Sequence, residues 1–188
     1  MLNRAAVNSM SKADADIIRL SSVPLTREKQ KKLEEEVRTY SSAVNYVIKE
    51  ILSRQISSAP KGVEALREEF KERYDSRPQY LEDVVKTARV VIGQHFRMEK
   101  TIRSMRGKTP FFKPGRIILS KPIVVVGEKA LILQSSENEV IPMPYDKHSR
   151  NRVALTLLKI VKGNRHYGRV RITYLREGYV EIDIRVEQ

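Results

Sequence analysis

The sequence predicts an α+β protein, a small antiparallel β-barrel with a helical bundle inserted after its first strand. Residues 16–23 read as a short strand, the next stretch of about 80 residues has helical periodicity, and the remainder has the two-residue period of strands. A lone strand is not stable in water, so the first strand must pair with the later ones. Several short strands separated by turns favour a barrel.

This organisation divides the chain into three parts. Residues 1–15 are small, polar and without period, and we expect them to be disordered. Residues 16–25 and 108–188 are predicted to form the β-domain, and 26–107 the helical insertion. The first strand ends at Pro24, because proline cannot continue a ladder.

The first predicted helix spans about residues 27–54. Thr26 is the expected N-cap, and Glu28 stands in the first turn, where the helix dipole favours an anion. The heptad-like spacing of its apolar stripe permits packing inside its own bundle, which we expect, or self-association through a partner helix. The stripe consists of Leu33, Val37, Tyr40, Val44, Val47 and Ile51.

A short helix is predicted at 63–74 and a long one at 79–105. We expect His95 to be packed at the edge of the core and not to bind a metal. Gly93, in mid-helix among basic residues, permits the close approach of a bound backbone or close packing against another helix. The buried stripe of the long helix is predicted to consist mostly of Leu81, Val84, Ala88, Val91, Ile92, Ile102 and Met105.

After Gly107 the apolar period changes to that of strands, with prolines at the borders. A closing hairpin is predicted to turn at Arg176-Glu177-Gly178, with Glu181 and Asp183 on the solvated face of its second strand. The earlier strands are predicted at "RIILS" (116–120), "IVVVG" (123–127), "ALILQ" (130–134) and "VALTLLKIV" (153–161), with basic loops at 146–152 and 162–171.

Composition excludes several classes of function. The 188 residues include no Cys, which excludes disulfides, thiol nucleophiles and cysteine-based zinc sites. No P-loop, HExxH or GxSxG motif occurs, so we expect no catalysis, no metal and no cofactor. There is no membrane-spanning apolar run and no signal-peptide pattern, which predicts a cytoplasmic protein without a membrane partner. Many Arg, Glu, Ile and Val beside few Asn and Gln are typical of a thermophilic source.

The net charge of +13 is concentrated in the second part of the chain. Residues 86–121 hold ten basic residues and one acid, Glu99, and residues 147–171 hold eight basic residues and no acid. Clustered charge of one sign is typical of a surface that binds a polyanion, so we predict nucleic-acid binding, to structured RNA or DNA, over a merely solvated basic surface. The predicted phosphate-binding residues are Lys86, Arg89, Arg97, Lys100, Arg103, Arg106, Lys108, Lys113, Arg116, Lys147, Arg150, Arg152, Lys162, Arg165, Arg169 and Arg171.

Two aromatic residues, Phe111 and Tyr167, are also predicted to bind nucleic acid. "FFKPGR" (111–116) places Phe111 and Phe112 in a basic loop, where a ring can stack on an unpaired base. Phe111 is the predicted binding residue, and at least one of the two rings is expected to anchor the loop in the core. Tyr167 lies in the second basic loop and is expected to project with its neighbouring arginines.

The order of these elements resembles the N-terminal half of TnpB, the RNA-guided nuclease family of insertion-sequence transposons, and of the related type V CRISPR effectors. The entry "VPLTREKQ" (23–30), the run "YSSAVNY" (40–46) and the element "FFKPGR" (111–116) are similar to the corresponding parts of the family, and "GYVEIDIRVE" (178–187) closes the order. The resemblance covers residues 16–188 and rests more on the order of elements than on single residues.

The resemblance implies that the barrel is a wedge domain and the helical insertion a recognition domain, which together bind guide RNA and a short DNA motif beside the target. In the family a nuclease domain follows the final strand, and it is absent from this sequence, so the implied role is binding without cleavage, with that domain missing or separate. Two alternatives stay open. One is a basic protein that binds ribosomal RNA or assists RNA processing, and the other is a protein-interaction module that acts through its first helix.

Overall fold

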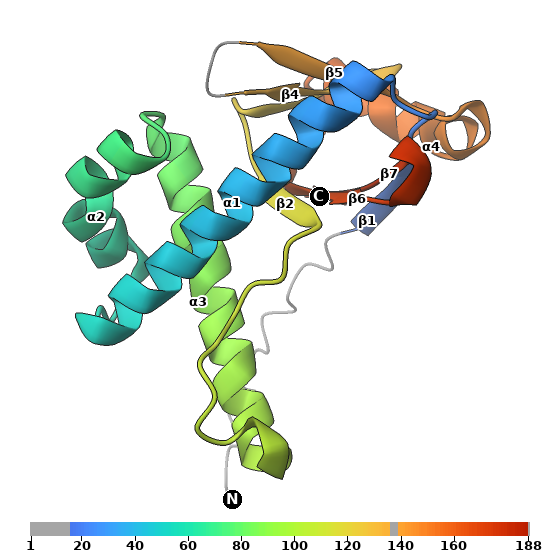
Figure 1. Cartoon of the computed structure of the whole chain (residues 1–188). Coiled ribbons are helices and arrows are strands. Elements are labelled where there is room, and N and C mark those ends of the chain that lie inside the picture. The colour runs from blue at the N-terminus through green and yellow to red at the C-terminus, as the bar shows by residue number, and fades with distance from the viewer. Residues whose placement is uncertain (1–15, 136–138, 188) are drawn as a thin grey trace, which may run out of the picture.

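The computed structural model describes residues 16–135 and 139–187 and has an α+β fold (Figure 1). The expected disorder of 1–15 falls outside the described residues. The elements are, in chain order, β1 (Asp16–Ser21), α1 (Arg27–Ser53), α2 (Ala59–Arg73), α3 (Pro78–Thr101), the 3-10 turn η1 (Arg103–Met105), β2 (Arg116–Leu119), β3 (Val124–Val126), β4 (Ala130–Gln134), β5 (Val140–Pro144), α4 (Lys147–Val161), β6 (Tyr167–Tyr174), the 3-10 turn η2 (Arg176–Gly178) and β7 (Val180–Val186).

The strands form two antiparallel sheets. The four-stranded sheet has the order β1-β7-β6-β2, and the three-stranded sheet has the order β3-β4-β5. β1 pairs with β7 from Asp16 opposite Val186 to Ser21 opposite Glu181, which confirms that the first strand joins the end of the chain. A bridge between Ser22 and Tyr145 joins the two sheets. Among the described strands no closed barrel is found.

The prediction of a strand at 153–161 is wrong, because these residues belong to α4. The basic stretch 146–152 is likewise not a loop but the N-cap and first turns of this helix. The Asp146 carboxylate caps it by accepting a hydrogen bond from Ser149 N at 2.9 Å. Leu157 and Ile160, three residues apart on one face, are its buried contacts. A short apolar run does not distinguish a strand from a partly buried helix.

The apolar stripe of α1 is buried inside the chain. Every residue of the stripe from Leu33 to Ile51 is at most 5% exposed, and α1 packs on α3 and β2. The Tyr40 hydroxyl in mid-stripe donates to Ile118 O at 2.9 Å and so ties the helices to the four-stranded sheet. Packing within the bundle is therefore confirmed, and the stripe has no exposed apolar surface to which a partner helix could bind. Thr26 occupies the N-cap position of α1, although its side chain makes no capping bond.

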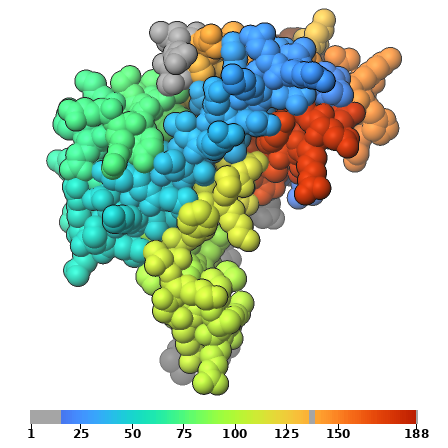
Figure 2. All heavy atoms as spheres, in the orientation of Figure 1, coloured from blue at the N-terminus to red at the C-terminus, as the bar shows by residue number. Residues whose placement is uncertain are grey.

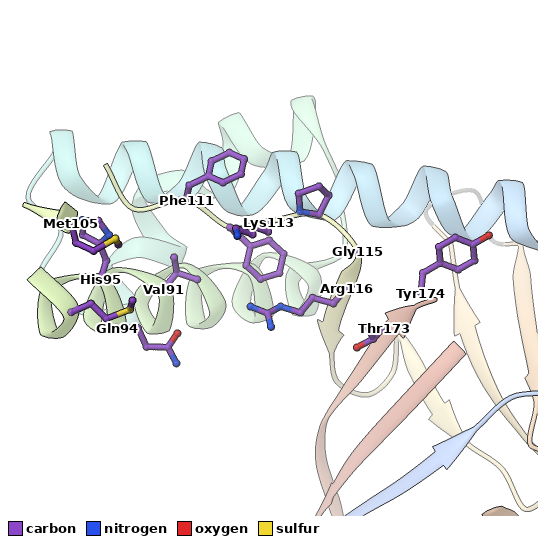
Figure 3. Close-up of a pocket in the computed structure, with 13 residues that line it drawn as sticks. Val91, Gln94, His95, Met105, Phe111, Lys113, Gly115, Arg116, Thr173 and Tyr174 are labelled. Atoms are coloured by element: carbon purple, nitrogen blue, oxygen red, sulfur yellow. The ribbon is translucent and has the colours of Figure 1, made fainter. Parts of the chain in front are cut away.

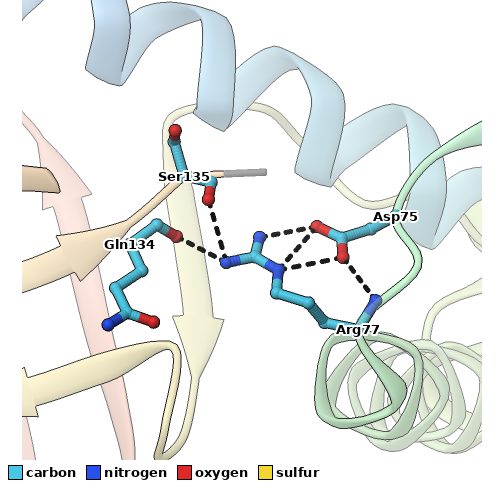
Figure 4. A network of polar contacts seen from close by, with 4 residues as sticks. All are labelled: Asp75, Arg77, Gln134 and Ser135. Atoms are coloured by element: carbon cyan, nitrogen blue, oxygen red, sulfur yellow. Dashed lines mark hydrogen bonds and ion pairs between the residues drawn. The ribbon is translucent and has the colours of Figure 1, made fainter. Parts of the chain in front are cut away.

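A second tie joins the turn between α2 and α3 to the end of β4 (Figure 4). The Arg77 guanidinium donates through Nη1 to Gln134 O at 2.8 Å and through Nε to Asp75 Oδ1 at 2.9 Å. Asp75 is only 7% exposed, so its charge depends on this partner. The contact fixes the helices against the three-stranded sheet.

The end of α3 projects from the rest of the molecule. We call residues 93–105 the arm, and residues 106–115, which run back along α3 to β2, the return segment (Figures 1 and 2). Of the residues predicted to be buried here, Ile102 is 42% exposed and Met105 is half-buried. Among the described residues, no helix has the length and apolar character needed to cross a membrane.

Candidate nucleic-acid interface

Phe112 anchors the return segment in the core. It is 1% exposed, and its ring meets that of Tyr40 edge to face, with 5.7 Å between centroids. Asn45 holds its backbone by two bonds: Phe112 N donates to Asn45 Oδ1 at 2.8 Å, and Asn45 Nδ2 donates to Phe112 O at 3.1 Å. Phe111 is turned outward and is 62% exposed. The expectation that one ring anchors this segment is confirmed.

A groove of about 680 Å³ lies between α3 and the return segment and reaches the end of β6 (Figure 3). One wall is the α3 face whose spacing of three and four residues brings Val91, Gln94, His95 and Met98 to one side. The return segment from Phe111 forms the opposite wall, and Thr173 and Tyr174 of β6 close one end. The groove therefore joins three parts of the chain that are far apart in sequence.

Two cations, Lys113 and Arg116, and no carboxylate line the groove. Both side chains are exposed, and the Arg116 guanidinium lies over the buried Phe112 ring, 5.2 Å from its centroid. Within the described residues neither cation pairs with a carboxylate. Neither charge is offset by a carboxylate that lines the groove, although Glu99 lies 3.7 Å from the groove residue His95.

Other predicted cations of α3 face away from the groove. Gly93, Arg97 and Lys100 follow the groove-lining residues by about two positions, and at 100° per residue this puts them on the opposite side of the helix. Arg97 Nε donates to Gly93 O at 3.2 Å, and Lys86 Nζ lies 3.4 Å from Glu82 Oε2. Nothing lies within 4 Å of a Cβ built on Gly93, so the expectation of close helix packing there is wrong.

The tip of the arm is basic on its surface because its one acid is turned inward. Glu99 Oε1 accepts a hydrogen bond from Gly107 N at 3.1 Å and lies 3.7 Å from His95 Nε2. His95 is 6% exposed, which confirms that it is a packed histidine. The exposed cations of the tip are Arg103, Arg106 and Lys108.

Arg89 and Arg169 are occupied inside the chain. Arg89 donates to Ile56 O at 3.2 Å and to Ser57 O at 2.7 Å, which closes the connection between α1 and α2. Arg169 Nη1 donates to Thr87 Oγ1 at 3.0 Å and so joins β6 to α3. The expectation that Arg169 projects as a free cation is wrong, since its position in the sheet brings it against the buried side of α3.

Tyr167 is also structural. It is 9% exposed, and its hydroxyl accepts from Val126 N at 3.1 Å and donates to Val124 O at 3.2 Å, which ties β6 to β3. Lys121 Nζ lies 4.5 Å from the centroid of its ring. The expectation that Tyr167 projects is therefore wrong.

Arg171 is half-exposed and forms an ion pair with Asp183, to which its Nε donates at 2.8 Å. Arg19 Nε lies 3.5 Å from the other Asp183 oxygen. Asp183 is 8% exposed, because the guanidinium groups of the neighbouring strands cover it. The expectation that it is solvated is wrong, whereas Glu181 is exposed as expected.

The remaining predicted cations form a second basic patch on α4 and the loop after it, at the far end of the molecule from the arm (Figure 1). Arg165 is half-buried and pairs with Asp16 Oδ2 at 3.0 Å. The other members of this α4 patch are Lys147, Arg150, Arg152 and Lys162, of which Arg150 is half-buried. The acid-free windows of the sequence thus correspond to two separate surfaces.

Sequence reasoning missed the polar residues of the groove. Gln94, Thr173 and Tyr174 line it without belonging to any charged run. The spacing of Val91, Gln94 and Met98 could have identified these groove residues, because it places them on one face of α3, between its buried side and its basic side. Nothing in the sequence pairs Asn45 with Phe112, which are 67 residues apart.

No group of three or more His, Cys, Asp or Glu side chains in the described part of the chain is placed to hold a metal ion. Comparison of the chain with models of known protein families finds no match. Comparison with curated protein sequences finds no match either.

Proposed function

We propose that this chain is a nucleic-acid-binding module, without catalytic activity of its own, whose main contact surface is the groove with the adjoining arm and return segment. One observation above all supports the proposal: the groove is lined by Lys113 and Arg116 and by no carboxylate. Nucleic-acid backbones are polyanions, and their binding releases counterions when such unpaired cations replace them.

The shape of the arm supports the same proposal. It projects from the body of the molecule (Figure 2), and its cations Arg97, Lys100 and Arg103 are exposed. A projecting basic element of this kind can enter a nucleic-acid groove or lie along a backbone. Arg97 and Lys100, on the side away from the groove, would then contact phosphates of a neighbouring segment.

We further propose that the two sheets correspond to a flattened, partly open barrel of the wedge type. The Ser22–Tyr145 bridge and the Tyr167 hydroxyl link the sheets on two sides. With three helices between β1 and β2, this arrangement supports the resemblance to the guide-RNA and target-DNA binding half of TnpB proteins.

Filter binding of a structured RNA at several salt concentrations tests the function and its location. Three double variants change the net charge equally: Lys113→Glu with Arg116→Glu in the groove, Lys147→Glu with Arg152→Glu on the α4 patch, and the control Lys49→Glu with Lys71→Glu on exposed sites of α1 and α2. Each phosphate contact contributes about −0.7 to −0.9 to the slope of log K against log salt.

We expect the groove variant to bind about 10- to 100-fold more weakly at low salt, with a slope flatter by about 1 to 2, and the control variant to bind like the wild type. A wild-type slope near zero would exclude nucleic-acid binding. If only the α4 variant binds RNA more weakly, the chain binds nucleic acid as proposed, but through the α4 patch and not through the groove.

The same surface would serve a basic protein that binds ribosomal RNA, and the identity of the RNA separates the two roles. Crosslinking to co-purified RNA followed by sequencing is expected to recover a guide-like RNA from a transposon end. Recovery of ribosomal RNA would contradict the proposed link to RNA-guided nucleases and leave the binding function in place.

A further inference from the structure

The groove has an apolar wall and an exposed aromatic ring at its rim. Val91 and Met98 belong to the α3 wall of the groove. Phe111, which is 62% exposed, points from the return segment away from α3 (Figure 3). Met98 is itself 42% exposed. A flat apolar ligand that enters here would cover side chains that the chain leaves open to water.

Polar groups without partners lie in the same wall. The Gln94 amide makes no hydrogen bond within the described residues, although it carries both a donor and an acceptor. His95 is more than nine-tenths buried, and its Nε2 atom has no hydrogen-bond partner. Figure 3 shows the Gln94 amide pointing away from the return segment, so it does not face a base that is stacked on Phe111.

Lys113 and Arg116 place positive charge along the same groove. The site therefore combines an exposed ring with two cations, and no carboxylate lines it. These groups recognise the face and the backbone of one nucleotide. A duplex does not match this set, because stacking covers the faces of its bases and leaves none for the exposed ring.

We propose that an unpaired nucleotide of the bound strand lies at the rim of the groove, with its base stacked on Phe111, while Lys113 and Arg116 hold the flanking phosphates. This inference rests on the proposed function, and it adds that the bound nucleic acid is single-stranded at this site. It makes Phe111 a selective contact for single-stranded segments, whereas the cations also contribute to duplex binding.

The absence of tryptophan from the sequence allows a direct test. Phe111→Trp introduces a single indole at the stacking position. Phe96→Trp is the matched control, since Phe96 is 47% exposed and lies on the side of α3 away from the groove. Each variant is titrated with a single-stranded RNA of about 12 nucleotides and with the duplex of the same sequence, within the site sizes typical of single-strand binders.

We expect the single strand to quench the emission of Phe111→Trp strongly and the duplex to quench it weakly, with little quenching of Phe96→Trp by either. Phe111→Ala is expected to weaken single-strand binding by about 5- to 150-fold, the range that stacking contributes per base, and duplex binding by less than about twofold. Its melting temperature should equal that of the wild type, because the ring is exposed.

Equal quenching of Phe111→Trp by both ligands, or unchanged single-strand affinity of Phe111→Ala, would overturn the inference. Unchanged affinity of Phe111→Ala would mean that the exposed ring serves another role, such as contact with a protein. In either case salt-dependent binding that is lost in the groove charge variant would still support the proposed function. Failure of that function is instead recognised by the absence of salt-dependent binding in the wild type.

Discussion

At the scale of single residues, identical side chains have opposite roles according to their partners. Phe112 is bound by Asn45 and buried, whereas its neighbour Phe111 faces solvent. Arg171 is paired with Asp183, whereas Arg116 has no carboxylate partner among the described residues. The sequence predicted that at least one phenylalanine would be anchored, and the structure buries only Phe112 of the two, since adjacent side chains of an extended segment point to opposite sides. It did not predict which arginines are occupied, since their partners lie far away along the chain.

Asp83 shows how such long-range contacts affect stability. It is fully buried, and its Oδ2 atom accepts bonds from Ser120 N and Ser120 Oγ, both at 2.7 Å, while Oδ1 has no partner in the described part of the chain. Burial raises the pKa of Asp83 above its ordinary value of 3.8, and the Ser120 bonds oppose this effect only in part. The folded state therefore binds the Asp83 proton more tightly than the unfolded state does.

The contribution of Asp83 to stability should fall as the pH rises through the interval between its unfolded pKa, near 3.8, and its higher folded pKa. We expect the free energy of unfolding of Asp83→Asn, relative to the wild type, to increase as the pH rises above about 4 and to level off above the folded pKa of Asp83, because asparagine carries no charge to bury. Urea unfolding at several pH values measures this difference. The exposed control Glu68→Gln should show a difference that hardly varies, and a flat or declining curve for Asp83→Asn would contradict the expectation.

At the scale of elements, periodicity predicted the helices of the insertion well and the last helix not at all. α1 has an uninterrupted stripe whose burial confirms it, and β1 was correctly expected to pair with a late strand. α4 was missed because its buried face is only Leu157 and Ile160, so its sequence lacks a long amphipathic repeat. Its polar first turns were taken for a loop, although the Asp146 cap was readable in the sequence.

The Arg77 contact between the helices and β4 should be a main source of rigidity between them. Arg77→Ala removes the donors to Gln134 O and Ser135 O and leaves the nearly buried Asp75 without its cation. Loss of one partner of a buried pair costs about 3–5 kcal/mol, and because Arg77 is partly exposed we expect about 2–4 kcal/mol in urea unfolding.

Two variants control this prediction. Arg77→Lys keeps the charge but not the planar fork, so it should recover less than half of the loss. Arg67→Ala, on an exposed site of α2, should change stability by less than about 0.5 kcal/mol. Equal stability of Arg77→Ala and Arg67→Ala would mean that the contact contributes nothing to the fold.

At the scale of the whole molecule, the groove arises only after folding. Its walls come from α3, from the return segment and from the end of β6, and the last of these is more than 50 residues away from the others in sequence. Composition located the charge in two windows of the sequence, but it did not predict how these windows lie relative to each other in the fold. The fold separates them, since α3 projects to one end while α4 packs against β1 and β3 at the other.

This distribution of charge predicts opposite effects of salt on the free and the bound protein. In the free protein the like charges of the arm and groove repel one another, so added salt should raise the melting temperature slightly by screening them.

Saturating RNA at low salt should raise the melting temperature far more. A ligand at 100 times its Kd stabilises the folded state by about 2.7 kcal/mol, which raises the melting temperature of a chain of this size by about 5–10 °C. Salt should then reduce that shift, since it weakens binding. In thermal melts without RNA, the Lys113→Glu and Arg116→Glu double variant should stay within about 1 kcal/mol of the wild type, because it loses the contact of Arg116 with the Phe112 ring but relieves charge repulsion. With RNA it should lose most of the shift. A groove variant that is less stable than this on its own would instead show that these cations support the fold, and an RNA shift that persists at high salt would show that binding does not depend on phosphate contacts.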